Sequence, residues 1–202
     1  MSSDALVHVV DDDAAVRQSL AFLLGTDGLA VRLHESASAF LASVSDPAGC
    51  ILTDVRMPGI DGIEFLHRLG QRGRMPAVIV MTGHADVAMA VEAMKAGAID
   101  FIEKPFDDEL LLASVRSAMT RLRRESDLAT EASAARKRIG ALSERERQVL
   151  EGLVAGKANK VIGLDLGISP RTVEIYRANV MTKLQAANLS ELVRMALMAD
   201  RP

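Results

Sequence analysis

The sequence predicts an α/β domain with a doubly wound parallel sheet, followed by a small all-α domain. Over the first 120 residues, five short apolar runs alternate with amphipathic helical patterns, and such alternation builds a parallel sheet with helices on both faces. The rest of the chain shows only helical patterns. With 202 residues and 49% hydrophobic residues, the chain is long and apolar enough for two small domains with cores of their own.

The expected strands are the apolar runs that end at a polar residue or a turn. They cover residues 6–10, 30–34, 50–53, 77–81 and 99–102. Helical patterns follow each of them, with Asp13 as cap of the first helix, Ser36 beginning the second and Gly97 closing the fourth. A fifth helix is expected to begin near Asp107.

Polar side chains follow four of these strands. They are Asp11 and Asp12, Asp54, Thr82, and Lys104. The carboxyl ends of parallel strands line one crevice, where carboxylate oxygens suit Mg²⁺. A metal, a lysine and a hydroxyl together can stabilise a phosphoryl group, which makes Asp54 a candidate phosphoryl acceptor. Taken singly, each residue fits a helix start, a turn or a solvated charge; the agreement of four strand ends favours the shared chemistry.

The same residues form an ordered set of motifs. An acid pair is followed by Asp54-x-x-Met-Pro-Gly-x-Asp-Gly, then by Met81-Thr-Gly-His, and then by Lys104-Pro-Phe. In this order they resemble a response-regulator receiver domain, covering residues 4–120. The resemblance implies a flavodoxin-like fold and phosphoryl transfer from a sensor histidine kinase to Asp54.

The receiver resemblance also assigns roles by position. It implies a Mg²⁺ ion held by the carboxylates of Asp11, Asp12 and Asp54 and by the backbone carbonyl of Arg56. Thr82 and Lys104 would contact the phosphoryl oxygens. Phe101 matches a switch aromatic that is often Tyr in this family; because Phe lacks the hydroxyl, only packing would drive its rotation. The Lys104–Pro105 bond is commonly cis in the family.

The segment after the receiver-like region differs in charge and composition. Residues 1–120 carry 9 basic and 17 acidic side chains, residues 121–141 carry 6 and 3, and residues 142–202 carry 9 and 7. This asymmetry predicts two domains with different partners. Residues 121–138 are rich in Ala and charge and contain neither Pro nor Gly, so we expect a partly rigid helical linker.

The last third of the chain predicts a helix-turn-helix. Ser143 and Glu146 fit a capping box, Asn159 is expected to cap the next helix, and Ser169-Pro170 is a strong helix start after a turn at Gly167. Helix pairs of this kind also occur as plain structural hairpins. The motifs Ser143-Glu-Arg-Glu, Asn159-Lys and Ile168-Ser-Pro-Arg-Thr-Val-Glu closely resemble a LuxR-type helix-turn-helix, which we place at residues 139–202.

This second resemblance implies a DNA-facing surface. The recognition helix would present Glu174, Ile175 and Ala178 to base edges, while its buried side holds Val173, Val180 and Leu184. Phosphate contacts position the protein without specifying sequence, and the residues expected beside the phosphates of the DNA are Lys160, Arg171, Thr172, Arg177 and Lys183. Asn159 is also expected to contact DNA. The family usually has His at the position of Tyr176.

The two halves together resemble a two-component response regulator. That resemblance implies a monomer that dimerises on phosphorylation, through residues 85–95 and the fifth strand, as a shift between two populated states. The dimer would bind double-stranded promoter DNA at half-sites about one helical turn apart and activate transcription with RNA polymerase as a further partner. Nitrogen-fixation or oxygen-responsive genes are the expected targets.

Two other functions remain open from the sequence. Asp11-x-Asp13, with Thr82 and Lys104, resembles a haloacid-dehalogenase-type phosphatase with Asp11 as the nucleophile. That family usually has Thr or Val where Ala15 stands, and it leaves the second domain unexplained. A DNA-binding protein with a vestigial receiver is the other possibility, and the intact acid set argues against it.

Composition excludes several other classes. A single cysteine, Cys50, rules out an intrachain disulfide and suits a reducing cytoplasm. The apolar run at 6–10 is too short for a signal peptide or a membrane span. Without Trp and with one Tyr, the chain offers little aromatic surface for stacking single-stranded nucleic acid. We therefore expect a cytoplasmic protein without membrane contact.

Overall fold

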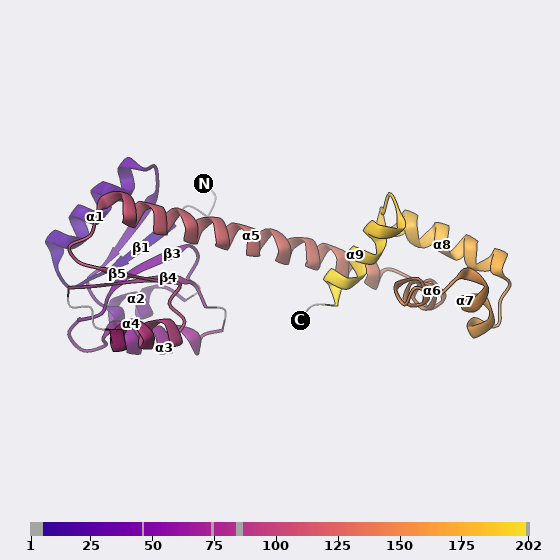
Figure 1. The fold of residues 1–202 in the computed structure, drawn as a ribbon, viewed down its shortest axis with the longest axis horizontal. Helices are drawn as coiled ribbons and strands as arrows, with labels where there is room; N and C mark the ends of the chain where they lie inside the picture. The colour runs from indigo at the N-terminus through magenta and orange to yellow at the C-terminus, as the bar shows by residue number, and fades with distance from the viewer. Residues whose placement is uncertain (1–5, 46, 74, 84–86, 201–202) are drawn as a thin grey trace. The chain divides into compact units, whose positions relative to one another are not determined.

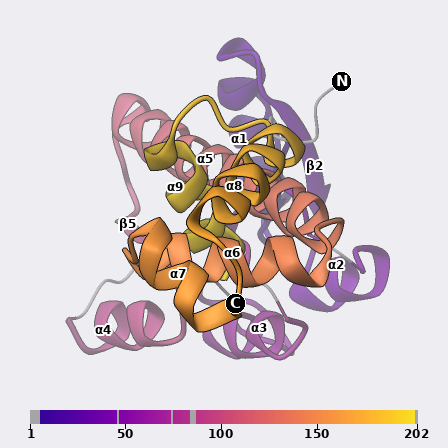
Figure 2. The same cartoon turned by 90° about the vertical axis from the view of Figure 1, so that its right-hand side faces the viewer.

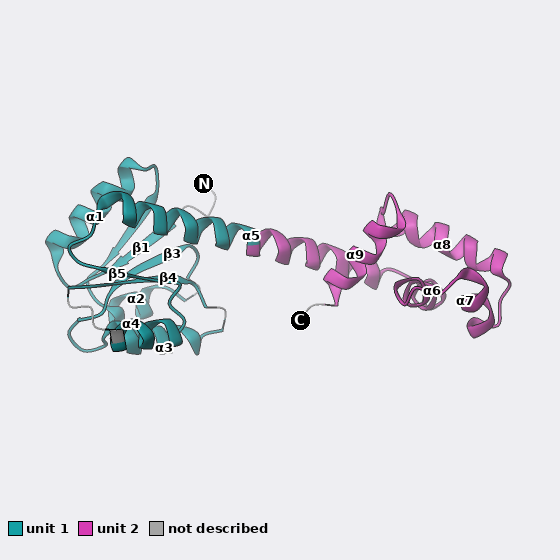
Figure 3. Cartoon of the chain, in the orientation of Figure 1, with its two compact units in different colours: residues 1–124 teal, residues 125–202 magenta. Residues whose placement is uncertain are grey.

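The computed structural model describes residues 6–45, 47–73, 75–83 and 87–200 (Figure 1). The chain divides into two compact units, residues 1–124 and residues 125–202 (Figure 3). Within the described residues, no helix is long and apolar enough to cross a membrane.

The first unit is built on a five-stranded parallel sheet in the order β2-β1-β3-β4-β5. Its strands are β1 Leu6–Val10, β2 Ala30–His34, β3 Cys50–Asp54, β4 Ala77–Thr82 and β5 Asp100–Glu103. Between them run α1 Ala14–Thr26, α2 Ala37–Ser43, α3 Gly62–Gly70 and α4 Val87–Lys95, and α5 Asp108–Gly140 follows. This strand order confirms the predicted flavodoxin-like, doubly wound sheet.

Helices cover both faces of that sheet, with α1 and α5 on one side and α2, α3 and α4 on the other (Figure 1). The cores follow the alternation of strand side chains. Val7 and Val9 pack with Leu111 of α5, whereas Val10 packs with Phe40 and other residues of the opposite face. Burying each large apolar side chain contributes about 1.5–3 kcal/mol, so two filled faces fix the register that places the strand ends.

Three strands, β3, β4 and β5, end one residue further along the chain than the sequence indicated, and β5 also begins one residue later, at Asp100. Asp54 is the last residue of β3 and pairs in register with Met81, and Thr82 is the last residue of β4 and pairs with Glu103. Both polar residues therefore belong to the ladder and not to the loops that follow. Rigid strands hold side chains in place better than loops do.

Helix α5 runs without interruption from Asp108 to Gly140. Residues 121–138, the expected linker, are helical throughout, and the division between the compact units falls inside this helix. The expectation of a helical connection is confirmed, and it is explained by good helix formers without Pro or Gly.

The second unit contains the last part of α5 and four shorter helices, which Figure 2 turns toward the viewer. They are α6 Glu144–Val154, α7 Asn159–Leu166, α8 Pro170–Leu184 and α9 Leu189–Ala199. The predicted capping box at Ser143 and Glu146 is present with both bonds, and Ser169 caps α8 with Pro170 at its start. Their core includes the predicted Val173, Val180 and Leu184.

The turn between α7 and α8 depends on two glycines. Gly167 has φ +67°, a left-handed conformation that favours glycine. A Cβ at Gly163 would lie 2.7 Å from the carbonyl oxygen of Ile168, so α7 lies too close to the backbone of the turn for any side chain at this position. The expected cap of α7 is wrong: Ala158 is the N-cap and makes no side-chain cap bond, because its extended backbone starts the helix one residue before Asn159.

Candidate functional site

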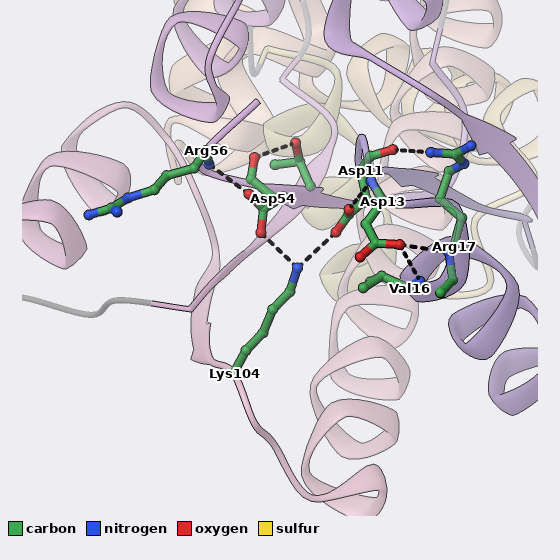
Figure 4. A network of polar contacts seen from close by, with 9 residues as sticks. Asp11, Asp13, Val16, Arg17, Asp54, Arg56 and Lys104 are labelled. Carbon is green, nitrogen blue, oxygen red and sulfur yellow. Dashed lines mark hydrogen bonds and ion pairs between the residues drawn. The ribbon is translucent and has the colours of Figure 1, made fainter. Parts of the chain in front are cut away.

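Three strand ends meet at one edge of the sheet, where a lysine lies between two carboxylates (Figure 4). The Lys104 Nζ atom is 2.8 Å from Oδ2 of Asp11 and 2.7 Å from Oδ1 of Asp54. Asp11 is 1% exposed and Asp54 is 8% exposed. Buried carboxylates are costly without an opposite charge, and Lys104 supplies that charge to both.

The pKa of Lys104 is raised by this arrangement. Burial disfavours the ammonium, but hydrogen bonds to Asp11 and Asp54 and the charges of both carboxylates together outweigh it. Lys104 therefore stays cationic at neutral pH, in a position to meet further negative charge at Asp54.

Asp54 is also held by its own backbone surroundings. The amide of Arg56 donates to its Oδ2 at 2.7 Å, and the hydroxyl of Thr53 donates to its carbonyl oxygen at 3.1 Å. A Cβ at Gly62 would lie 2.4 Å from that carbonyl oxygen. The start of α3 therefore lies directly against the backbone of Asp54.

All four polar atoms of Asp11 have partners. Its amide donates to the carbonyl of His34 at 3.2 Å, and its Oδ1 accepts from the amide of Asp13 at 2.9 Å. Its Oδ2 accepts from Lys104. Its carbonyl oxygen accepts from Nη1 of Arg17 at 2.7 Å. The acid is thus fixed by contacts from β2, from α1 and from the residue after β5.

The three consecutive acids have different surroundings. Asp11 is buried, Asp12 is exposed, and Asp13 caps α1 by accepting from the amides of Ala15 and Val16. The N-cap at Asp13 was predicted and is confirmed.

The donor set suits a hard cation. Asp11 and Asp54 converge on one point and offer carboxylate oxygens, which Mg²⁺ takes together with waters. Within the described part of the chain, no cluster of three or more His, Cys, Asp or Glu side chains is arranged around a common metal position. Asp12 is exposed beside this pair, and Arg56 contacts Asp54 through its amide.

The expected switch residues lie on the neighbouring strands. Thr82 is fully buried, and its hydroxyl lies 3.8 Å from the sulfur of Met89 on α4. Phe101 is half-buried and packs against the core on the α2–α4 face. The Lys104–Pro105 bond is cis, as the resemblance implied. The motif residue His84 and two residues of the expected dimer surface, Ala85 and Asp86, lie outside the described residues.

The predicted DNA-facing residues lie on α7 and α8. Glu174, Ile175 and Ala178 are exposed, opposite the buried side of α8, as the pattern predicted. The other residues expected to contact DNA are exposed or half-buried, namely Asn159 and the phosphate set Lys160, Arg171, Thr172, Arg177 and Lys183. Two of them have partners within the unit: the Thr172 hydroxyl is 2.8 Å from that of Ser169, and Lys183 pairs with Glu146 at 2.7 Å. Tyr176 is half-buried against the core.

Sequence reasoning missed two features near the site. One is the Arg17 contact with the Asp11 carbonyl; an arginine near three acids suggests a charge pair and gives no sign of a backbone partner. The other is the pair His8 and His34, whose Nδ1 and Nε2 atoms are 3.0 Å apart beside Phe40. The parallel pairing of β1 and β2 was the signal that could have brought them together.

Two family models match the chain. The response regulator receiver domain matches residues 7–116, and the luxR family of bacterial regulatory proteins matches residues 140–196. The phosphatase alternative has no support in these comparisons. A receiver joined to a LuxR-type domain implies a sensor kinase as partner and binding to DNA, and receiver domains generally use Mg²⁺.

Similar proteins extend over nearly the whole chain. The chain is 63% identical to the transcriptional regulatory protein FixJ of Azorhizobium caulinodans over 194 residues, which cover 96% of this chain and 92% of that protein. FixJ of Rhizobium meliloti is 53% identical over 196 residues, covering 96% of each. The crystal structure of full-length FixJ from B. japonicum is 49% identical, with a TM-score of 0.61 and 98% of each chain covered. The chain therefore belongs to the FixJ-type response regulators, which join a receiver domain to a LuxR-type DNA-binding domain and regulate transcription.

Proposed function

We propose that Asp54 accepts a phosphoryl group from a sensor histidine kinase. A carboxylate oxygen of Asp54 attacks the phosphorus of the kinase phosphohistidine, the P–N bond breaks, and the imidazole leaves and takes up a proton. The product is an acyl phosphate on Asp54. The observation that carries this proposal is the Lys104 ammonium within 2.8 Å of both buried carboxylates, because the acceptor then gains negative charge beside a fixed cation.

Mg²⁺ is the proposed cofactor of this transfer, and it supplies charge neutralisation at the phosphoryl oxygens when bound. Its ligands would be the carboxylates of Asp11, Asp12 and Asp54 and the carbonyl of Arg56. Thr82 and Lys104 would contact the phosphoryl oxygens. Support comes from the buried pair Asp11 and Asp54, whose oxygens point toward one ammonium.

The response to phosphorylation is proposed to run through β4 and β5. Thr82 leaves its contact with Met89 for the phosphoryl group, and Phe101 repacks into the space near α4. On the described part of the expected dimer surface, Val91 and Met94 of α4 are 45% and 49% exposed. Exposed apolar side chains of this kind suit an interface between two copies, so we propose a monomer that dimerises when phosphorylated.

In DNA binding, the exposed side of α8 enters the major groove, with Glu174, Ile175 and Ala178 at base edges. Asn159, Lys160, Arg171, Thr172 and Arg177 contact phosphates. The exposure of these residues opposite a fully buried side of α8 supports this assignment. Lys183 was expected to act with them, but its ion pair with Glu146 favours a role in holding α8.

Three further parts of the proposal concern the wider role of the chain. The receiver catalyses only its own phosphorylation and dephosphorylation and acts on no separate substrate. The protein works in the cytoplasm as an activator, with RNA polymerase as a further partner. By its resemblance to FixJ, its targets are nitrogen-fixation or oxygen-responsive genes, which transcript profiling of a strain with Asp54→Asn tests directly.

The test is the intact mass of the full chain after incubation with acetyl phosphate and Mg²⁺. We expect one stable phosphoryl adduct in the wild type and none in Asp54→Asn. Dimerisation and promoter binding by the phosphorylated chain are then measured by sedimentation and by fluorescence anisotropy. Turnover of phosphate without an adduct, lost in Asp11→Asn and kept in Asp54→Asn, would overturn the proposal in favour of the phosphatase.

A further inference from the structure

We infer that Arg17 is a positioning residue for the metal-binding side of the phosphorylation site, acting through the backbone of Asp11. Its Nη1 atom donates to the Asp11 carbonyl oxygen at 2.7 Å. Figure 4 shows this side chain reaching from α1 to the end of β1. The inference rests on the proposed function, because it concerns how Asp11 and Asp12 are placed to bind Mg²⁺.

The Asp11 carbonyl lies beyond the last regular pairing of its strand. The register of β1 with β2 ends at Val10 and His34, and the amide of Asp11 makes one further bond to the His34 carbonyl. The ladder therefore fixes the amide of Asp11, while the carbonyl turns toward α1. Arg17 provides the hydrogen bond at that carbonyl, as buried backbone groups require.

The peptide unit that Arg17 holds joins the two acids expected at the metal. Its carbonyl belongs to Asp11 and its amide to Asp12. The orientation of this peptide plane therefore determines the direction in which the side chain of each aspartate leaves the backbone. The orientation of a peptide plane depends on two soft torsions, ψ of the residue before it and φ of the residue after it. A guanidinium that fixes this plane therefore fixes the relative placement of a buried and an exposed carboxylate.

Arg17 also brings positive charge to an acidic turn. Asp11, Asp12 and Asp13 are consecutive, and like charges at this spacing oppose one another. A guanidinium with several donors in a fixed plane suits this place better than an ammonium, which is a point charge on a flexible stem. Mutation of a residue that hydrogen-bonds and orients a metal ligand, without binding the metal itself, typically lowers metal affinity or activity by about 10–100-fold.

The experiment is a calorimetric titration of the full chain with Mg²⁺ alone, on wild type, Arg17→Met, Arg17→Lys and Arg68→Met. Arg68 is a matched control because its ion pair with Glu64 lies on the exposed side of α3. We expect the Kd for Mg²⁺ to rise about tenfold in Arg17→Met, to rise less in Arg17→Lys, and to stay unchanged in Arg68→Met.

A second readout separates positioning from general stability. With acetyl phosphate, the Mg²⁺ concentration for half-maximal phosphorylation of Arg17→Met should shift by the same factor as the Kd, while the rate at saturating Mg²⁺ stays within about twofold of wild type. A Kd within twofold of wild type overturns the inference. If Arg17→Met does not fold, Arg17→Gln decides by the same criterion.

The inference and the proposed function fail differently. A wild-type chain that binds no Mg²⁺ would contradict the proposed cofactor itself. A wild type that binds Mg²⁺ and forms the Asp54 adduct, beside an Arg17→Met variant with the same Kd, would leave the proposed function intact and remove only the role of Arg17.

Discussion

The Lys183 ammonium lies 2.7 Å from Oε2 of Glu146, whose side chain is only 5% exposed. The same oxygen accepts from the amide of Ser143 at 2.7 Å. One carboxylate therefore joins the start of α6 to the end of α8, the proposed recognition helix. The hydrogen bond from Lys183, followed by that from the Ser143 backbone, lowers the pKa of Glu146.

This pair predicts that Lys183→Met destabilises the second unit more than Lys160→Met does. The first variant leaves a buried carboxylate without its cation, whereas Lys160 is exposed. Thermal unfolding of the full chain, monitored through the NMR signals of α8, should show a lower midpoint only for Lys183→Met. Because the pKa of Glu146 is lowered, this difference is present above pH 4.5, its ordinary pKa, and fades as the pH falls below it.

DNA binding supplies the opposite contrast. Lys160→Met should weaken binding uniformly across sequences and reduce the slope of log K against log salt by about 1, as expected for one lost phosphate contact. Suppose that Lys183→Met leaves the thermal unfolding midpoint unchanged and reduces the slope of log K against log salt as Lys160→Met does. Lys183 would then be a phosphate contact, and its ion pair with Glu146 would not be needed for stability.

Lys183 also shows where sequence reasoning stops. A basic residue near the end of a recognition helix has the same sequence pattern whether it meets a phosphate or a buried glutamate, and only the packing of α6 against α8 distinguishes the two. Arg17 is harder still, because its partner is a backbone carbonyl, which every residue has.

The central site was predictable for a physical reason. Asp11, Asp54 and Lys104 are separated by 43 to 93 positions, yet each follows or ends a buried apolar run. Parallel strands place their carboxyl ends at one edge, so the expected parallel sheet and the polar strand ends together predicted the cluster. The continuous helix from 108 to 140 was predictable in the same way, since nothing in residues 121–138 breaks a helix.

The histidine pair predicts a loss of stability in mild acid. Burial, then the charges of His34 and Arg32, lower the pKa of His8 from 6.5 to about 4, opposed by a hydrogen bond with the Ala48 backbone. Burial and Arg32 lower the pKa of His34 as well. As the pH falls, His8 takes up its proton in the unfolded chain at a higher pH than in the folded chain. The contribution of His8 to the free energy of unfolding should therefore be constant above about pH 6.5 and fall between pH 6.5 and pH 4. At pH 5 the loss should be about 2 kcal/mol.

Urea unfolding at pH 7 and at pH 5, monitored through the NMR signals of the β1 amides, measures this loss in the free energy of unfolding. His8→Leu removes the titrating group and should lose most of the pH dependence. An NMR titration in which the His8 ring gains its proton near pH 6.5 would contradict the prediction.

Lys104→Met should separate the two roles of the ammonium. Without it, Asp11 and Asp54 face each other as buried like charges, so the unfolding midpoint without metal should fall. Added Mg²⁺ should then raise the midpoint more than in the wild type, because it neutralises charges that have lost their cation. At saturating Mg²⁺, adduct formation from acetyl phosphate should be about a hundredfold slower. Wild-type rates in this variant would mean that Lys104 only holds the carboxylates together.

Two glycines of α3, Gly62 and Gly70, allow a test and a control substitution for the contact between α3 and the backbone of Asp54. A Cβ at Gly62 would lie 2.4 Å from the Asp54 carbonyl oxygen and 2.9 Å from Cα of Val55, whereas a Cβ at Gly70 meets nothing within 4 Å. Gly62→Ala must therefore move either α3 or the end of β3, at a cost of about 1–3 kcal/mol. Gly70→Ala should be neutral or stabilise the helix by up to about 1 kcal/mol. The midpoint of thermal unfolding and the rate of adduct formation from acetyl phosphate should both be lower in Gly62→Ala than in the wild type, and neither should be lower in Gly70→Ala. If Gly62→Ala loses stability but keeps the wild-type rate, then α3 gives way, and the strand alone holds the acceptor in place.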